Sequence, residues 1–244
     1  FAAKKPNIVF IMADDLGWSE LGSYGQRKIK TPNIDQLAKE GMRFTANYSG
    51  NAVCAPSRCV LMTGKHPGHA IVRNNKAMKP EGQHPIPDSE VTIGELLQKE
   101  GYVTGAFGKW GLGNTWSTGN PTKQGFNRFF GYNCQAHAHS YYPATLWSNN
   151  ELYKLNNKPP VPGHASLPKG ADSSDPRSYD IFKGTDYAPD RINDRALAFI
   201  QKNKDRPFYL YYPTVIPHVA LHVPDEELKP YLAKKWNAPP FTRG

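Results

Sequence analysis

The sequence has no apolar run long enough to cross a membrane. A spanning helix needs roughly 18 or more consecutive apolar residues, whereas the longest apolar run of this 244-residue chain covers only residues 8–13. Hydrophobic residues make up 39% of the chain and charged residues 21%, a balance typical of a folded globular protein and not of a disordered segment. We therefore expect no membrane span and a sizeable buried core.

Cysteines and clustered basic residues are also scarce. The three cysteines, Cys54, Cys59 and Cys134, are too few for a disulfide scaffold and lack the paired spacing of a zinc site. The net charge is +9, but the Lys and Arg residues are scattered and form no basic run of the kind that binds nucleic acid. We expect no nucleic-acid partner. The positive charge indicates either a solvated basic surface or a field that attracts an anionic substrate.

Alternating strand and helix patterns predict an α/β fold. The apolar, β-branched run at residues 8–13 is typical of a parallel strand that is buried on both faces. Thr31 and Thr92 are suited to be helix N-caps. We expect a mostly parallel sheet, with strands at residues 8–13, 42–48, 102–107 and 207–212 and helices at residues 32–41, 54–62, 92–101 and 193–203.

The strand and helix pattern is lost over residues 134–189, which are rich in Pro, Gly, Ser, Asn and aromatic residues. An irregular stretch of this length usually forms substrate-facing loops or a small hairpin. After Tyr212 the pattern predicts no closing helix or strand, and residues 238–244 are expected to form a loop. We therefore expect the natural chain to continue beyond Gly244, because the apolar faces of the strand at 207–212 would otherwise stay exposed.

The most informative segment is Cys-Ala-Pro-Ser-Arg at residues 54–58, which Thr-Gly follows at residues 63–64. An Asp-Asp pair precedes it at residues 14–15. Gly-Lys-Trp-Gly-Leu-Gly at residues 108–113 and Pro-His at residues 217–218 come later in the chain. In this order the motifs resemble those of the type I, formylglycine-dependent sulfatases. The resemblance covers nearly the whole chain and implies the alkaline-phosphatase-like α/β/α sandwich with a mostly parallel central sheet.

The resemblance implies that Cys54 is oxidised to Cα-formylglycine by a maturation enzyme. A sulfate ester spreads its negative charge over its oxygens, so cleavage needs a strong nucleophile and cations that hold those oxygens. By the same resemblance the hydrated aldehyde is the nucleophile and Arg58 steadies it. Lys109 would bind a sulfate oxygen, and His218 would bind sulfate or protonate the leaving oxygen. A helix that begins at Cys54 would also direct its N-terminal dipole at the anion.

Asp14 and Asp15 are candidate metal ligands, with residue 54 as a third. Two adjacent carboxylates at the end of a buried strand repel each other unless a cation lies between them, and hard oxygen ligands favour Ca²⁺ or Mg²⁺. The resemblance favours calcium over magnesium. Relatives complete this site with an Asp-Asn pair and a second lysine, and no matching segment follows His218. We expect residues 1–244 to be the N-terminal portion of the catalytic domain, with these ligands and a smaller C-terminal domain beyond it.

Gly111 departs from the family pattern, because many sulfatases have a histidine there that assists the aldehyde hydrate. The histidines considered as replacements are His69, His137, His139 and His222. His137 and His139 lie in a segment dense in hydrogen-bonding and aromatic groups, which suits a sugar ring in a cleft. We expect one of the two to touch substrate, and the alternative is a hydrogen-bonded structural loop. A transition-metal site at this pair is not expected, because no third ligand is nearby.

The expected function is therefore hydrolysis of sulfate monoesters, on a sulfated carbohydrate, by an exported enzyme that is periplasmic or secreted, or lysosomal in a eukaryote. Two alternatives stay open. The same nucleophile and metal could serve a phosphoester or phosphonate monoester hydrolase, or the chain could be an inactive glycan-binding relative in which Cys54 stays unconverted. Cys59 and Cys134 are expected to be separate thiols, with a disulfide between them as the alternative.

Overall fold

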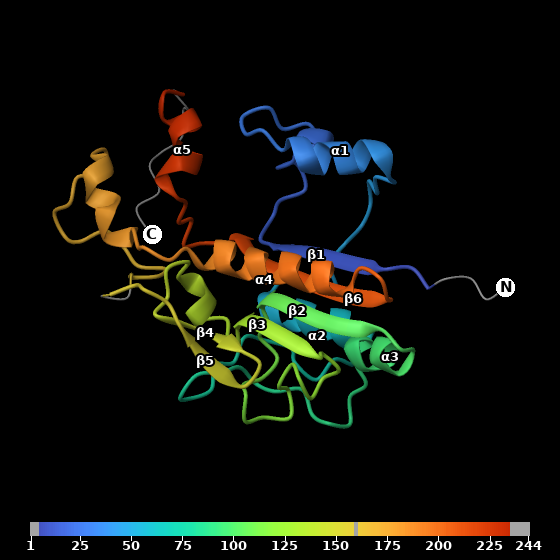
Figure 1. Cartoon of the computed structure of the whole chain (residues 1–244). Helices are drawn as coiled ribbons and strands as arrows, with labels where there is room; N and C mark the ends of the chain where they lie inside the picture. Colours follow the sequence, from blue (N-terminus) through green and yellow to red (C-terminus); the bar gives the residue numbers. More distant parts are fainter. Residues whose placement is uncertain (1–4, 159–160, 235–244) are drawn as a thin grey trace.

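The computed structural model describes residues 5–158 and 161–234 and has one six-stranded sheet at its centre (Figure 1). The order of the strands is β1 (Ile8–Asp14), β6 (Phe208–Pro217), β2 (Val103–Lys109), β3 (Arg128–Tyr132), β4 (Thr145–Ser148) and β5 (Glu151–Lys154). The first four strands are parallel, and β4 and β5 form an antiparallel hairpin at one edge. The predicted α/β fold with a mostly parallel sheet is confirmed.

Helices cover both faces of the sheet, so the fold has three layers (Figure 1). The helices α2 (Cys54–Thr63) and α3 (Ile93–Lys99) lie on one face, and α4 (Ala188–Asn203) lies on the other. Side chains alternate between the two faces along β6: Tyr209 packs in the core on the side of α2, and its neighbour Phe208 packs in the core on the side of α4.

The local signals for helix ends succeed at α3 and fail in part at α1 (Pro32–Glu40). At α3 the Thr92 hydroxyl accepts from the Glu95 N–H, while the Glu95 carboxylate accepts from the Thr92 N–H, which is the capping box. Thr31 was expected to cap α1, but its side chain makes no cap hydrogen bond. The hydroxyl instead accepts from the N–H of Gly22 at 2.9 Å, so tertiary contacts replace the cap.

Two strand predictions are wrong. Residues 42–48 form a loop and not a strand, with Met42 and Phe44 exposed. The strand β1 was expected to be buried on both faces, yet Val9 is 48% and Ile11 62% exposed. The reason is its place in the sheet, because within residues 5–158 and 161–234 β1 is the outermost strand and has β6 as its one neighbour. Conversely β6, whose apolar faces were expected to stay exposed unless more chain followed, is largely buried, because the cores beside α2 and α4 cover its two faces.

The end of the described chain also differs from the prediction. A helix, α5 (Asp225–Leu232), follows β6 where no further element was expected. Its first turn carries Asp225, Glu226 and Glu227, and acidic residues at this position stabilise the positive end of the helix dipole. The predicted loop at residues 238–244 lies outside the described residues.

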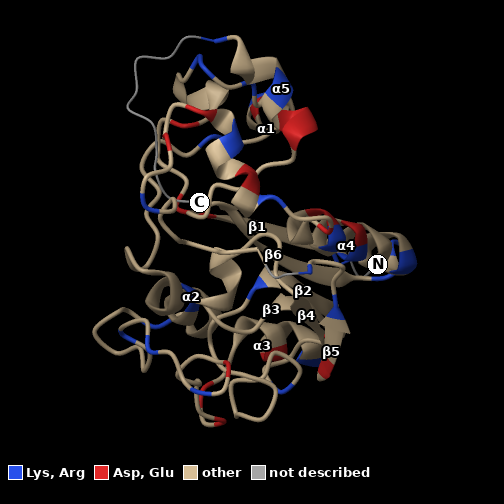
Figure 2. Cartoon of the chain, turned by 90° about the vertical axis from the view of Figure 1, so that its left-hand side faces the viewer, with Lys and Arg blue, Asp and Glu red and all other residues tan. Residues whose placement is uncertain are grey.

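The irregular stretch at 134–189 contains a small hairpin, one of the two forms expected there. The hairpin is β4–β5, and two 3₁₀ turns, η2 (His137–His139) and η3 (Pro176–Phe182), flank it. In the view of Figure 2, basic and acidic residues are interspersed over several elements. Among the described residues, no helix combines the length and the apolarity that crossing a bilayer requires.

Candidate active site

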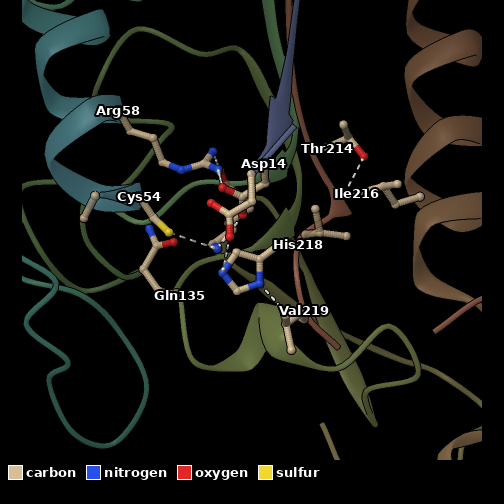
Figure 3. A network of polar contacts seen from close by, with 12 residues as sticks. Asp14, Cys54, Arg58, Gln135, Thr214, Ile216, His218 and Val219 are labelled. Carbon is tan, nitrogen blue, oxygen red and sulfur yellow. Dashed lines mark hydrogen bonds and ion pairs between the residues drawn. The ribbon is translucent and has the colours of Figure 1, made fainter. Parts of the chain in front are cut away.

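The candidate active site lies where three parallel strands end and α2 begins (Figure 3). Asp14 ends β1, Lys109 ends β2, and His218 follows β6 directly. Cys54 is the first residue of α2, and Arg58 lies one turn further along it. Carboxyl ends of parallel strands meet at one sheet edge, which is where α/β folds place their ligands. The structure thus brings together the residues that the motifs predicted.

Asp14 is held between two buried cations. Lys109 Nζ lies 2.6 Å from Asp14 Oδ2, and Arg58 Nη2 lies 3.3 Å from Asp14 Oδ1. Burial acts to raise the pKa of Asp14, but the charges of Arg58 and Lys109 outweigh it and hold the pKa below its usual range. The cluster therefore contains two positive charges and one negative charge, in a place where water screens them weakly. A second anion beside it would be stabilised.

Cys54 faces this excess of positive charge. Its Sγ accepts from Lys109 Nζ at 3.6 Å. Burial works to raise the pKa of the thiol, but a hydrogen bond from His218 and the charge of Lys109 lower it overall. The same hydrogen bond to Cys54 is the main reason that the pKa of His218 is raised. Residue 54 is thus a position where negative charge or a polar oxygen is favoured.

Cys54 also stands at a helix N-terminus. The N-cap residue Val53 makes no side-chain cap hydrogen bond, and the N–H of Ala55 donates to Asn75 Oδ1 at 3.0 Å. Asn75 lies in the loop after α2, and no motif in the sequence pointed to it. The dipole of α2 adds to the positive potential at residue 54.

Asp15 lies at the mouth of the site. Its φ of 63° is uncommon for a residue other than glycine. Its Oδ2 lies 3.4 Å from His218 Nε2, and its side chain is 57% exposed. Asp14, Cys54 and His218 each offer a ligand atom, and these three atoms lie within 4.8 Å of one another. Asp15 is not one of this group, so the predicted ligand set is only partly brought together.

A cavity of about 230 Å³ opens at this position. Asp14, Asp15, Cys54 and Arg58 are among the residues that line it. A larger cavity of about 590 Å³ lies beside α4, near residues 223–226, and no predicted site residue lines it. The smaller cavity is therefore the one that the predicted site residues line.

The structure separates His137 and His139, one of which was expected to touch substrate. The His139 ring stacks on the His218 ring, with centroids 4.8 Å apart and planes 12° apart. Burial, with the charge of Lys109, lowers the pKa of His139 to about 4, so it is neutral. His137 instead pairs with Glu81, with Nδ1 and Oε1 3.1 Å apart. His139 thus joins the site, and His137 makes the structural contact that was the alternative.

The other two histidines lie elsewhere. The His69 ring packs against the ring of His66. His222 is buried next to Tyr142 and Phe182, and burial lowers its pKa to about 4. Neither shows a contact with the site in the described part of the chain.

All three cysteines are free thiols. Cys59 is part of the core beside the sheet, and burial raises its pKa. Burial also raises the pKa of Cys134. The prediction of separate thiols is confirmed, and Cys54 alone of the three has a lowered pKa.

Comparisons with known proteins agree with this geometry. The sequence model of the family named Sulfatase matches residues 6–237. The chain belongs to the sulfatase family. Human N-acetylgalactosamine-6-sulfatase is 32% identical over 239 residues, which are 95% of this chain and 42% of the relative. Human arylsulfatase A is 45% identical over 130 residues, which are 53% of this chain and 25% of the relative.

The fold is also that of the family. The crystal structure of Ps i-CgsB in complex with k-i-k-neocarrahexaose is similar, with a TM-score of 0.77 and 29% identity over 96% of this chain and 50% of that one. The likeness supports the expected alkaline-phosphatase-like fold. The chain spans less than half the length of the curated relatives named above.

This sulfatase chain carries Gly111 where the family pattern has a histidine, and a residue that the sequence analysis missed fills the space. Gly111 has a φ of 78°, and a Cβ at this position would lie 1.5 Å from Gln135 Nε2. The contact depends on how the segment after β2, which carries Gly111, is aligned with the segment after β3, which carries Gln135. No motif in the sequence could have indicated it.

Proposed function

We propose that the protein hydrolyses sulfate monoesters and that its substrate is a sulfated carbohydrate. The observation that carries the proposal is the buried cluster in which Lys109 and Arg58 face a single carboxylate, Asp14, beside residue 54. Its net positive charge suits an ester that carries a sulfate group. The sugar-sulfatase name of the human relative supports a carbohydrate as the substrate class.

We infer that Cys54 is matured to Cα-formylglycine by a maturation enzyme. The modification would supply an oxygen nucleophile at residue 54 and a route by which sulfate is released afterwards. Cys54 is partly accessible, whereas Cys59 and Cys134 are buried, so its position fits a residue that must be modified and must then meet substrate. Its place at the end of three strands and the start of α2 also fits.

The other site residues have distinct roles in this proposal. Lys109 has three N–H donors, of which one is on Asp14 and one faces Cys54, so one is left for a sulfate oxygen. Arg58 donates to the carbonyl of Lys109 and pairs with Asp14, which holds both in place. Both charges stabilise the anion as its ester bond breaks.

His218 is the proposed proton donor to the leaving oxygen. Its Nδ1–H donates to the carbonyl of Val219, so Nε2 is the nitrogen that faces the site. In the chain with unmodified Cys54, a hydrogen bond with the thiol raises the pKa of His218. A general acid needs the protonated form of the imidazole, and an oxygen at residue 54 could accept from the same nitrogen. The neutral His139 ring stacked on it fixes the plane of the imidazole without adding charge.

We propose calcium as the cofactor, with Asp14, Asp15 and the modified residue 54 among its ligands; magnesium is the less favoured ion. Two carboxylates suit a hard cation, whereas the thiol of unmodified Cys54 suits a softer one. An oxygen at residue 54 would therefore improve the fit. Calcium takes about six to eight oxygen ligands, so we propose that further ligands come from sequence beyond Gly244, with a smaller C-terminal domain.

The proposed location is the periplasm or the exterior of the cell, or the lysosome in a eukaryote. The support is the resemblance to exported sulfatases and the need for a maturation enzyme. No nucleic acid is proposed as a partner, because the Lys and Arg residues are scattered along the chain and form no basic run.

The test uses the full-length protein produced with and without a formylglycine-generating enzyme. Conversion of Cys54 should lower the mass of its peptide by about 18 Da, and only converted protein should cleave an aryl sulfate. Activity should fall on chelation of calcium and return when calcium is added. A higher kcat/KM on an aryl phosphate would favour the phosphoester hydrolase instead. A natural protein with unconverted Cys54 that still binds glycan would favour the inactive relative.

A further inference from the structure

Gln135 has a buried carboxamide without a hydrogen-bond partner. The residue is 3% exposed, and neither Nε2 nor Oε1 has a partner among the described residues. Only its backbone is held, since its N–H donates to Gln83 Oε1 at 3.1 Å. Burial of an unpaired amide is costly, and folded proteins rarely tolerate it without a ligand or an ordered water.

The position of Gln135 is fixed by the strands that carry Lys109. The N–H of Trp110 donates to the carbonyl of Tyr132, and the N–H of Gly111 donates to the carbonyl of Asn133. This continues the pairing of β2 with β3 past their ends and places the Gln135 side chain over Gly111. The Cβ of any other residue at 111 would lie 1.5 Å from Gln135 Nε2. The absence of a side chain at 111 therefore makes room for this carboxamide.

The carboxamide is directed at the active site. Gly111 is two residues beyond Lys109, whose Nζ contacts Cys54. Figure 3 shows the Gln135 side chain directed toward the space next to Cys54, with Arg58 on the other side of that residue. An uncharged carboxamide, which carries two N–H donors, thus lies beside the position that Lys109 and Arg58 make favourable for an anion.

We propose that Gln135 is a further substrate-binding residue, whose Nε2–H donates to an oxygen of the sulfate group held at residue 54. The inference rests on the proposed function, since it takes sulfate as the group that is bound. An amide donor does not titrate, so this contact is the same at every pH at which the protein is folded. A histidine in this space would make the contact depend on its protonation.

The affinity of the full-length protein for inorganic sulfate tests the proposal, measured by calorimetry with Cys54 unconverted. Gln135→Met keeps the length of the side chain and removes the hydrogen bond, so sulfate should bind roughly 10- to 100-fold more weakly. The matched control is Gln124→Met. Gln124 is equally buried, but its Nε2 donates to the carbonyl of Thr118 in another loop. This variant should bind sulfate as the wild type does.

A second variant keeps the test independent of packing. Gln135→His retains a donor, so its sulfate affinity should depend on pH more steeply than that of the wild type, with tighter binding below the ordinary histidine pKa of about 6.5 and weaker binding above it. If Gln135→Met folds but binds sulfate like the wild type, or if the pH dependence of Gln135→His equals that of the wild type, the inference is overturned and the proposed function stands. If the wild type binds no sulfate, the proposed function itself fails.

Discussion

Lys109 and Asp14 join the ends of two strands that are not neighbours in the sheet. Lys109 ends β2 and Asp14 ends β1, with β6 between them, yet Nζ and Oδ2 are 2.6 Å apart. Both side chains are buried, and a buried pair is tolerated only while both partners are present. The ion pair therefore fixes the spacing of the strand ends that surround residue 54.

Replacement of Lys109 by methionine should impair both stability and activity. The change leaves the Asp14 carboxylate with Arg58 as its only buried cation, and loss of one partner of a buried pair costs about 3–5 kcal/mol. Loss of the donor to sulfate should lower kcat by about 10²–10³-fold. Urea unfolding and steady-state kinetics would measure the two effects.

The double variant Lys109→Met with Asp14→Asn is the control for stability. It removes both charges, so much of the free energy of unfolding should return while activity stays low. An active double variant would contradict the role of Lys109 in sulfate binding.

Asp15→Asn tests the proposed calcium site. Asparagine tolerates the positive φ of this position, so the fold should be kept while one anionic ligand is lost. The calcium concentration that gives half-maximal activity should rise, because the affinity for a hard cation depends on ligand charge. The matched control is Asp205→Asn. Asp205 lies in the turn before β6, at the amino end of that strand and therefore away from the site. An unchanged calcium dependence in Asp15→Asn would remove this residue from the site.

The two histidines of η2 should respond differently to substitution. His139→Ala removes the ring stacked on His218 and should lower kcat/KM by about tenfold or more. His137→Ala breaks the pair with Glu81, which should cost about 1 kcal/mol of stability and leave the kinetics nearly unchanged. Thermal unfolding and steady-state kinetics on both variants would distinguish these roles, and equal kinetic losses would show that the assignment is wrong.

Buried His222 should make the fold sensitive to acid. Burial lowers its pKa from 6.5 to about 4, so the folded state disfavours its protonation. Its contribution to stability is complete above pH 6.5 and is lost as the pH falls toward 4, because the unfolded chain takes up the proton first. His222→Asn keeps an acceptor for the N–H of Tyr141 and should flatten this part of the pH profile. Unfolding midpoints measured between pH 4 and 7 would show it, and parallel curves would contradict the assignment.

Most of the site residues could be predicted from the sequence, but the exposure of the strands around the site could be predicted less well. Asp14 and Lys109 end recognisable strands and His218 follows one directly, and parallel strands place their carboxyl ends at one edge of the sheet whatever their order. The exposure of Val9, in contrast, depends on the order of the strands. The pairing of β1 with β6 places β1 at the edge of the sheet, and the local sequence does not indicate this order. Gln135 was missed because its place over Gly111 depends on how β2 and β3 are aligned, and local patterns do not record this.

The open edge of β1 has a practical consequence for the handling of this region. Val9, Phe10 and Ile11 lie on an outer strand and remain partly accessible. A long apolar edge strand with free N–H and C=O groups is a template for pairing with another molecule. When residues 5–234 are produced alone, this edge should cause self-association. Lysine in place of Ile11, whose side chain is 62% exposed, should reduce the self-association.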